Sequence, residues 1–119
     1  PLITMKFDII SLTVEDMERA VKFYRKVFEV EPEKEDNRFS YFQLENAKLG
    51  LYNPDADGVN VPFGENCVPA FKTEDLDAEH ERLDKLAPEI EEISDKGSYR
   101  IFHFKDPEGN MMEVYEGEK

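Results

Sequence analysis

The sequence has a single cysteine, no tryptophan and no long apolar run among its 119 residues. Because Cys67 has no partner in the chain, a scaffold held by intrachain disulfides is excluded. No stretch approaches the roughly 18 apolar residues that a membrane-spanning helix needs, and no basic start leads into an apolar segment as in a signal peptide. We therefore expect a cytoplasmic protein without a membrane partner.

Basic residues are also scarce, with 15 Lys and Arg against 28 Asp and Glu, which gives a net charge of −13. This charge repels phosphate backbones, so we expect no nucleic-acid partner. It would attract a cationic ligand. However, the acidic residues are concentrated at 29–36 and 74–95, a pattern typical of solvated surfaces. The charge therefore favours an interpretation as solubility over one as ligand selection.

A faint internal repeat divides the chain almost in half. The segment Ile9–Met17 recurs in pattern as Val68–Leu76, with an identical Glu-Asp pair in each copy. Such a repeat indicates two similar structural units within the single domain, residues 5–119, that the length predicts. We expect module 1 at about 5–53, a linker at about 54–65 and module 2 at about 66–116. Two similar modules can face each other across one cleft.

Hydrophobic periodicity predicts the elements of module 1. Strict alternation over Phe7–Val14 is typical of a half-buried strand. Its core face comprises Ile10, Leu12 and Val14. Asp16 can cap a helix whose apolar stripe recurs at three- and four-residue spacing as far as Phe28. After a polar connection, strands are expected at 38–44 and 47–52.

Module 2 repeats this order. Asp75 can cap a second helix, which ends before Pro88. The inward positions of this helix are Leu76, His80, Leu83 and Ala87. Strands are then expected at 89–93, 99–105 and 110–115. The last two form a hairpin around Asp106–Gly109, which has Pro and Gly where a tight turn favours them. Each module is therefore predicted to be β-α-β-β-β.

This order resembles the vicinal oxygen chelate superfamily, which includes glyoxalase I, extradiol dioxygenases, fosfomycin-resistance enzymes and bleomycin resistance proteins. The resemblance covers nearly the whole chain and is carried by Ile9–Tyr24, Val68–Leu83 and the closing motif Phe102–Glu113. It implies an α+β fold, the glyoxalase/bleomycin resistance/dioxygenase-like fold, in which two β-α-β-β-β modules curl their sheets around a cleft. Because members often dimerise, it also implies a homodimer.

The resemblance implies four metal-ligand positions, and three of them lack a donor in this sequence. These positions fall on Ile9, on Val68 in the repeat and near Gly50, so only Glu113 could bind an ion. A catalytic divalent ion typically needs about three protein ligands. A metal cofactor is therefore disfavoured, unless other side chains such as His103 contribute.

The resemblance assigns the strand face of Glu113 to the cleft, and alternation adds further residues to that face. The expected ligand-binding residues are Ile9, Ser11, Gly50, Tyr52, Val68, Lys72, Met111 and Tyr115. Tyr52 and Tyr115 occupy equivalent places in the two modules. Aromatic walls of this kind suit a planar or cationic molecule.

Glu113 and His103 are the candidate catalytic residues. A carboxylate in a partly apolar cleft needs a partner, which could be His103, Lys72 or a ligand. A Glu and His pair can act as base and acid in a metal-free isomerisation or hydrolysis. The sequence shows no third catalytic group at a suitable spacing. We therefore prefer the interpretation that Glu113 and His103 only orient a bound molecule or pair structurally. His80 and Cys67 are interpreted as packed residues.

The sequence thus predicts a metal-free member of the glyoxalase/bleomycin resistance family that binds a small organic molecule, cationic or aromatic, between the modules. The alternative is a lyase or isomerase of the glyoxalase type, which uses Glu113 with a divalent metal or with His103. A third interpretation is a regulatory domain with a vestigial cleft. Whether the modules pair within one chain or between two chains stays open.

Overall fold

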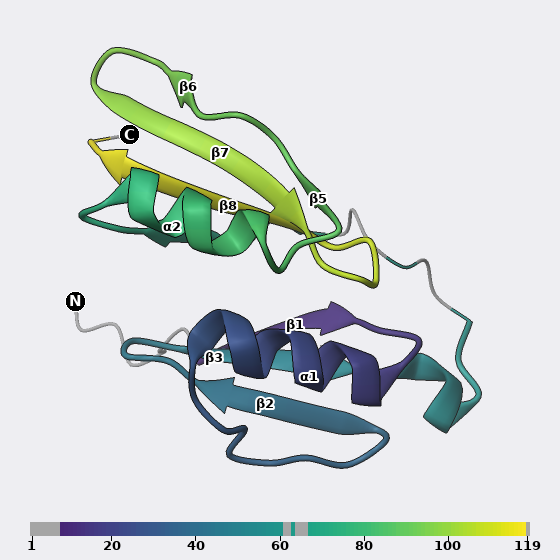
Figure 1. The fold of residues 1–119 in the computed structure, drawn as a ribbon. Helices are drawn as coiled ribbons and strands as arrows, with labels where there is room; N and C mark the ends of the chain where they lie inside the picture. The colour runs from purple at the N-terminus through teal and green to yellow at the C-terminus, as the bar shows by residue number, and fades with distance from the viewer. Residues whose placement is uncertain (1–7, 61–62, 64–66, 119) are drawn as a thin grey trace, which may run out of the picture.

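The computed structural model describes residues 8–60, 63 and 67–118 and confirms an α+β fold of two modules (Figure 1). The elements of module 1 are β1 (Ile9–Thr13), α1 (Met17–Phe28), β2 (Phe39–Gln43) and β3 (Lys48–Tyr52). A short 3₁₀ helix, η1 (Pro54–Asp57), follows them. The elements of module 2 are β4 (Ala70–Lys72), α2 (Leu76–Asp84), β5 (Glu89–Ile90), β6 (Ser94–Asp95), β7 (Tyr99–Lys105) and β8 (Met111–Gly117).

The sheet of module 1 has the order β1-β3-β2, with β1 parallel and β2 antiparallel to β3. The predicted β-α-β-β-β order is wrong for this module. Between α1 and β2, the described residues form only an isolated bridge between Lys34 and Tyr41. The physical reason is the composition of residues 29–37, which are mostly acidic, contain Pro32 and lack the apolar alternation of a strand.

The sheet of module 2 has the order β4-β8-β7-β5, and β6 pairs with the other end of β7. The strand predicted at 89–93 is shorter in the structure, because β5 ends at Ile90. At the next position the Glu91 carboxylate, in place of a backbone carbonyl, accepts a hydrogen bond from the His103 backbone N–H at 2.8 Å. The Glu91 backbone N–H still donates to the His103 backbone oxygen at 3.0 Å, so the side chain replaces the acceptor of only one of the two backbone hydrogen bonds.

The strand registers make the two modules equivalent in detail. Ser11 pairs with Gly50 in the parallel ladder of module 1, and Ala70 pairs with Glu113 in that of module 2. Two residues further on, Thr13 pairs with Tyr52, and Lys72 with Tyr115. Gly50 and Glu113 therefore occupy corresponding places, as the sequence repeat predicts.

Helix α1 begins and ends as its sequence predicts. The Asp16 side chain accepts a hydrogen bond from the Arg19 backbone N–H at 3.0 Å, which caps the first turn. At the other end Glu29 adopts the left-handed conformation, with φ of 57°. The apolar stripe of the helix is buried and consists of Met17, Ala20, Val21, Phe23, Tyr24 and Val27.

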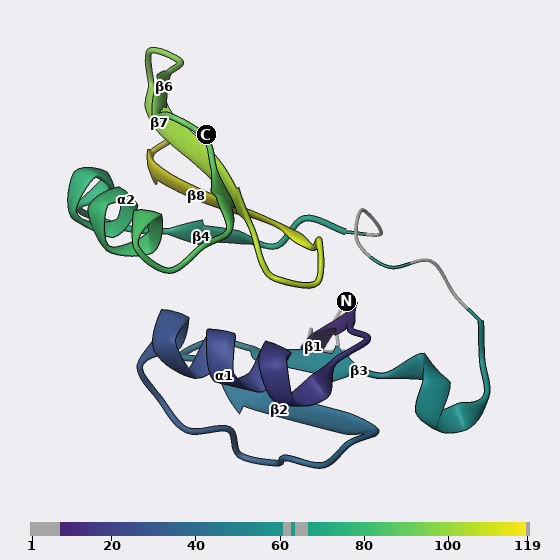
Figure 2. The same ribbon diagram turned by 45° about the vertical axis from the view of Figure 1, so that its right-hand side comes forward.

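Both modules share one hydrophobic core, and α1 lies between the two sheets (Figures 1 and 2). The ring of Phe23 on α1 lies 6.4 Å from that of Phe104 on β7, and the ring of Phe28 lies 5.7 Å from that of Phe71 on β4. The modules therefore meet through the helix-covered sides of their sheets. None of the helices among the described residues has the length and apolar character needed to cross a membrane.

Candidate functional site

Each sheet has one face packed against the helices and one face turned away from them, which we call its outer face. Leu12, Leu49 and Leu51 of module 1 are at most 1% exposed and belong to the shared core. The alternate side chains form the outer face of module 1, namely Ile9, Ser11, Phe39, Tyr41, Gly50 and Tyr52. By the same alternation, the outer face of module 2 carries Lys72, Ile101, His103, Met111, Glu113 and Tyr115.

The expected ligand-binding residues therefore do not meet within one chain. Ile9, Ser11, Gly50 and Tyr52 lie on one outer face, whereas Lys72, Met111, Glu113 and Tyr115 lie on the other. The apolar faces of the two sheets bury against α1 and α2, and this packing directs the outer faces away from each other (Figure 2). Within one chain, the expected ligand-binding residues thus form two separate surfaces.

Glu113 and His103 come together on the outer face of module 2. They are directly paired in the antiparallel ladder of β7 and β8, and His103 Nε2 lies 3.1 Å from Glu113 Oε1. Glu113 is 8% exposed. The long hairpin around Asp106–Gly109 fixes this pairing, because it sets the register of the two strands.

A second carboxylate completes this group from the other side. Glu91, directly after β5, places its Oε1 atom 2.5 Å from His103 Nδ1. The two carboxylates therefore hold the His103 ring in one orientation between Glu91 and Glu113.

A shallow cavity of about 190 Å³ lies beside this group. Glu91, His103 and Met111 line it together with Glu89, Ile90, Phe104 and Lys105. Its walls combine apolar side chains with a few charged groups, which is typical of sites for small organic molecules. The carboxylate–imidazole group therefore has space for a ligand next to it.

The remaining predicted residues of module 2 lie further from this group. Lys72 Nζ lies 3.2 Å from Glu118 Oε1 near the end of the chain, so the ion pair that the structure gives it is with Glu118. Val68 precedes β4 and is 46% exposed. Tyr115 is half-buried on β8, two residues after Glu113.

The outer face of module 1 is built around Gly50. A side chain at this position would begin 2.8 Å from Ser11 Oγ, 3.0 Å from the Phe39 ring and 3.1 Å from Ile9 Cδ1. These neighbours occupy the space that a ligating side chain would need. Glycine thus lets these three side chains form a small floor at the position that the resemblance assigns to a metal ligand.

Tyr52 at the rim of this floor belongs to a polar cluster. Its hydroxyl donates to Asp57 Oδ2 at 2.7 Å, and Arg38 Nε lies 2.9 Å from Asp57 Oδ1. The hydrogen bond from the Tyr52 hydroxyl, followed by that from Arg38, holds the pKa of Asp57 below its usual value. The same bond to Asp57 raises the pKa of Tyr52. The tyrosine therefore presents a neutral ring, held in place, to the outer face.

The described donor set does not fit the metal centre that the family implies. Ile9, Gly50 and Val68 have no side-chain donor, and Glu113 alone corresponds to a family ligand. Among residues 8–60, 63 and 67–118, no three His, Cys, Asp or Glu side chains are grouped so that they could hold a metal ion. No chemical step through a metal is derived for this chain.

His80 and Cys67 have the environments expected of packed residues. His80 Nε2 lies 2.8 Å from the Glu91 backbone oxygen, and its ring meets that of Phe102 edge-on at 4.8 Å. Partial burial raises the pKa of the Cys67 thiol, which keeps it protonated. Neither side chain contributes to the group around Glu113.

Glu91 is the candidate site residue that sequence reasoning missed. It lies in a strongly acidic segment, and the nearby Glu89 and Glu92 are also glutamates, so the sequence does not distinguish Glu91 from them. The alternation along 89–91 places Glu91 on the face of Glu89, but the strand partner was not known from the sequence. Only the pairing of β5 with β7 shows that this carboxylate faces His103.

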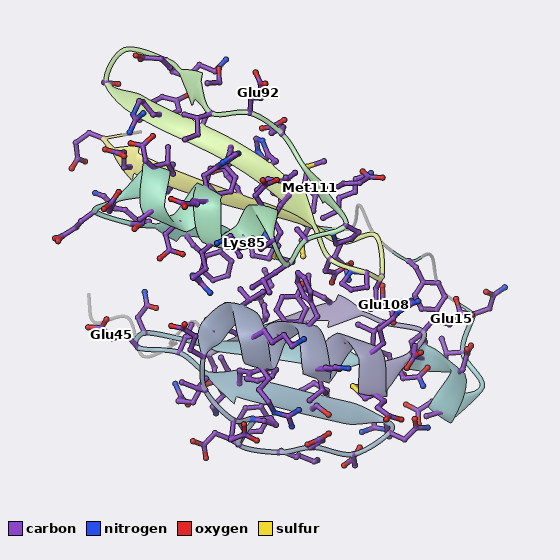
Figure 3. All side chains as sticks on the ribbon, viewed as in Figure 1. Glu15, Glu45, Lys85, Glu92, Glu108 and Met111 are labelled. Carbon is purple, nitrogen blue, oxygen red and sulfur yellow. The ribbon has the colours of Figure 1, made fainter. Side chains whose placement is uncertain are left out.

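The closing turn has a structural role that the sequence did not reveal. Glu108 Oε1 accepts a hydrogen bond from the Asp16 backbone N–H at 2.7 Å, and its Oε2 lies 2.6 Å from Arg19 Nη2. Asn110 Nδ2 donates to the Thr13 backbone oxygen at 3.1 Å. Figure 3 shows Glu108 beside the start of α1. The turn of module 2 is thus bound to the β1–α1 junction of module 1.

Comparison with known proteins agrees with this architecture. The model of the Glyoxalase/Bleomycin resistance protein/Dioxygenase superfamily matches residues 6–114. A solved structure of a glyoxalase-related enzyme from Fulvimarina pelagi has a TM-score of 0.79 at 17% identity, over 94% of this chain and 88% of that one. This similarity shows a shared fold.

Two curated relatives are enzymes by name. The trivalent organoarsenical cleaving enzyme of Bacillus sp. (strain MD1) is 29% identical over 117 residues, which cover 93% of this chain and 73% of that protein. The metallothiol transferase FosB of Shouchella clausii (strain KSM-K16) is 29% identical over 115 residues, which cover 90% of this chain and 77% of that protein.

Proposed function

The chain belongs to the glyoxalase/bleomycin resistance protein/dioxygenase superfamily, and from this premise we propose that it binds a small organic molecule at the outer face of module 2. The observation that carries the proposal is the group formed by Glu113, His103 and Glu91 beside a cavity of about 190 Å³. The group has two carboxylates around one imidazole, so its net charge is negative. The ligand is therefore aromatic or cationic, and it binds without a metal.

The outer face of module 1 supplies the other wall of the site, from a second copy of the chain. This face presents half-buried aromatic rings, and Lys48 and Arg38 lie over those of Tyr41 and Tyr52 at 5.3 and 5.8 Å. Both cations already have carboxylate partners in module 1, Lys48 with Asp8 and Arg38 with Asp57, so the aromatic rings are what this face offers a second copy. Association of two copies would cover both outer faces and bury these rings.

Calorimetric titration tests the binding proposal. Bleomycin-like cations and neutral aromatic molecules are titrated into the protein, and we expect a measurable affinity for at least one compound. In Glu113→Gln the affinity should fall by about tenfold or more, because the negative anchor is lost. The same exchange at Glu45, an exposed residue in the turn between β2 and β3, should leave affinity unchanged. No heat from any compound at millimolar concentration would contradict the proposal.

Light scattering tests whether a second copy of the chain supplies the other wall of the site. We expect the mass of a homodimer, because each outer face needs the other to be covered. Replacement of Tyr41 by Glu puts a charge on the outer face of module 1 and should shift the population to monomer. A wild-type protein that is monomeric at all accessible concentrations would refute this part of the proposal.

A second candidate function is an enzyme of the lyase or isomerase kind, and the position of Glu91 specifically favours it. A histidine oriented by one carboxylate and facing another has the geometry of a positioned acid or base. The relatives named as an organoarsenical-cleaving enzyme and a metallothiol transferase support testing for turnover. In this function His103 would move a proton at Nε2, and Glu91 would hold the ring.

Two measurements separate this candidate from simple binding. Turnover of a trivalent organoarsenical, or thiol transfer, that disappears in both Glu113→Gln and His103→Gln would establish catalysis by this group. Elemental analysis of the purified protein tests the involvement of a metal. Stoichiometric Ni, Zn, Mn or Fe would show that ligands outside the family positions have been recruited.

A further inference from the structure

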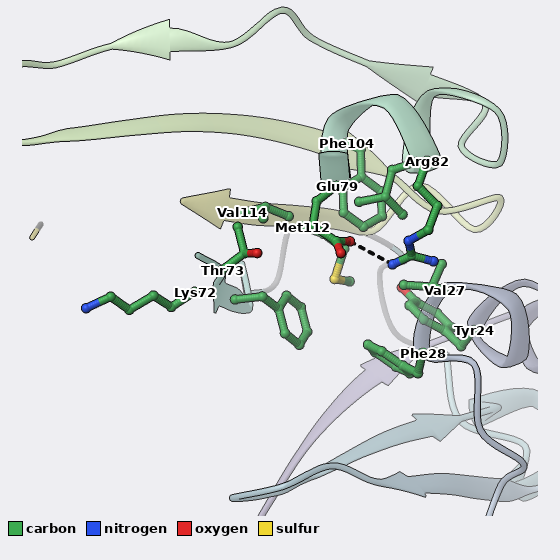
Figure 4. Close-up of a pocket in the computed structure, with 12 residues that line it drawn as sticks. Tyr24, Val27, Phe28, Lys72, Thr73, Glu79, Arg82, Phe104, Met112 and Val114 are labelled. Carbon is green, nitrogen blue, oxygen red and sulfur yellow. Dashed lines mark hydrogen bonds and ion pairs between the residues drawn. The ribbon is translucent and has the colours of Figure 1, made fainter. Parts of the chain in front are cut away.

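A second cavity, of about 200 Å³, lies on the helix side of the sheets, between the modules (Figure 4). Phe28 on α1 and Phe71 on β4 line it side by side, with ring centroids 5.7 Å apart. Phe104, Met112 and Val114 form the base and are at most 5% exposed. This cavity is separated from the outer faces by the sheet of module 2, and it belongs to both modules.

The polar side chains that line this cavity already have partners. The Tyr24 hydroxyl donates to Asp106 Oδ2 at 2.7 Å, and Thr73 Oγ1 accepts from the Asp75 backbone N–H at 3.2 Å. The Lys72 side chain extends away from the cavity (Figure 4) and is paired with Glu118. Among the described residues, the lining thus offers a guest mainly aromatic and aliphatic surface.

Arg82 closes one side of the cavity and is similarly engaged. Its Nη2 atom lies 2.8 Å from Glu79 Oε2, and its Nη1 donates to the Lys26 backbone oxygen at 3.3 Å. The guanidinium therefore connects α2 to the last turn of α1 and carries its own counter-charge. A charged guest would have to displace this pair, whereas a neutral guest would leave it intact.

We propose that this cavity is a binding site for a neutral molecule with a single aromatic ring. An apolar cavity of about 150 Å³ is known to accommodate benzene, so the volume here is sufficient for one ring. Phe28 and Phe71 provide the edges and faces that aromatic guests prefer. Because the guest contacts α1 and β4 together, its binding stabilises the docking of the modules.

Fluorobenzene is the probe for this site, observed by 19F NMR. We expect its resonance to broaden on addition of the protein, with nuclear Overhauser effects to the rings of Phe28 and Phe71 and to the Met112 methyl group. Val27→Phe places a ring in the cavity, because Val27 lines it. This variant should weaken fluorobenzene binding by about tenfold or more.

Val30→Phe is the matched control, since it introduces the same ring at a position that is 42% exposed and outside the cavity. It should bind fluorobenzene like the wild type, and so should Glu113→Gln, which alters only the outer face. The proposal is overturned if wild type does not bind at the solubility limit of the probe, if both Val→Phe variants bind alike, or if the contacts map to Met111 and Tyr115. Should Val27→Phe fail to fold, the contact map alone decides.

Discussion

Tyr24 shows how a single residue connects the two modules. It lies on α1 with no exposed surface, and its hydroxyl donates to Asp106 Oδ2 of module 2, which is itself 2% exposed. Asp106 also accepts from the backbone N–H groups of Glu108 and Asn110, both at 2.8 Å. A buried carboxylate of this kind depends on having all its donors.

Replacement of Tyr24 by Phe should therefore lower the free energy of unfolding by about 1–3 kcal/mol, because one donor to a buried carboxylate is lost. Urea denaturation followed by circular dichroism measures the change. Tyr52→Phe is the control, since its hydroxyl also bonds to an aspartate but at the surface, and the loss there should be smaller. Equal losses of unfolding free energy in Tyr24→Phe and Tyr52→Phe would mean that burial does not strengthen the contribution of this hydrogen bond.

Tyr24 also predicts a pH dependence. Burial, and then the charge of Asp106, raises the pKa of Tyr24 well above its usual value. Unfolded tyrosine loses its proton near pH 10, so above about pH 10 the unfolded state releases a proton that the folded state keeps. The free energy of unfolding should consequently fall as pH rises through this range. Tyr24→Phe should show a shallower decrease between about pH 9 and 11 in urea titrations, and an unchanged slope would contradict the assignment.

At the scale of the elements, the two helices are capped in the same way. Asp16 accepts from the Arg19 backbone N–H at 3.0 Å, and Asp75 accepts from the Ala78 backbone N–H at 3.1 Å. Both caps are visible in the sequence as the repeated Glu-Asp pair. The acidic residue before each cap, Glu15 or Glu74, is exposed.

Asp16→Ala and Asp75→Ala should each lower the free energy of unfolding by about 1 kcal/mol, within the range of 0.5–2 found for lost caps. Chemical denaturation of the two variants measures both effects. Glu15→Ala and Glu74→Ala serve as neighbouring controls and should have little influence. If a control lowers the free energy of unfolding as much as its cap variant does, the negative charge stabilises the helix and the capping hydrogen bond does not.

At the scale of the whole molecule, the closing turn holds the modules together. The side chain of Glu108 is only 3% exposed, although its partner Arg19 is 50% exposed. One carboxylate thereby joins the hairpin of module 2 to both the backbone and a side chain at the start of α1. The contact is charge-assisted and largely shielded from solvent, which makes it stronger than an ordinary surface ion pair.

Glu108→Ala should destabilise the fold by about 1–3 kcal/mol, because the Asp16 N–H and the Arg19 guanidinium lose their shared acceptor. Hydrogen exchange is the sensitive measurement, and we expect faster exchange at the start of α1 than in β7 and β8. Glu18→Ala removes an exposed acid from the same helix turn and should leave exchange in the hairpin and at Asp16 unchanged. Uniform acceleration in Glu108→Ala would mean that the turn supports overall stability and not module docking.

The sequence by itself determined the elements, their caps and the correspondence of Gly50 with Glu113. These features depend on alternation, on three- and four-residue spacing and on a repeat, all of which are local or periodic. Two predictions are wrong in detail: the order β-α-β-β-β counts one strand more than the sequence pattern of module 1 contains, and the strand predicted at 89–93 ends at Ile90.

Only the tertiary structure decided which sheet faces meet. The packing of α1 between the sheets depends on contacts between residues far apart in the chain, such as Asn110 with Thr13 and Phe28 with Phe71. This packing directs the outer faces apart and creates the cavity between the modules. The approach of Glu91 to His103 likewise follows from strand pairing, which no spacing in the sequence specifies.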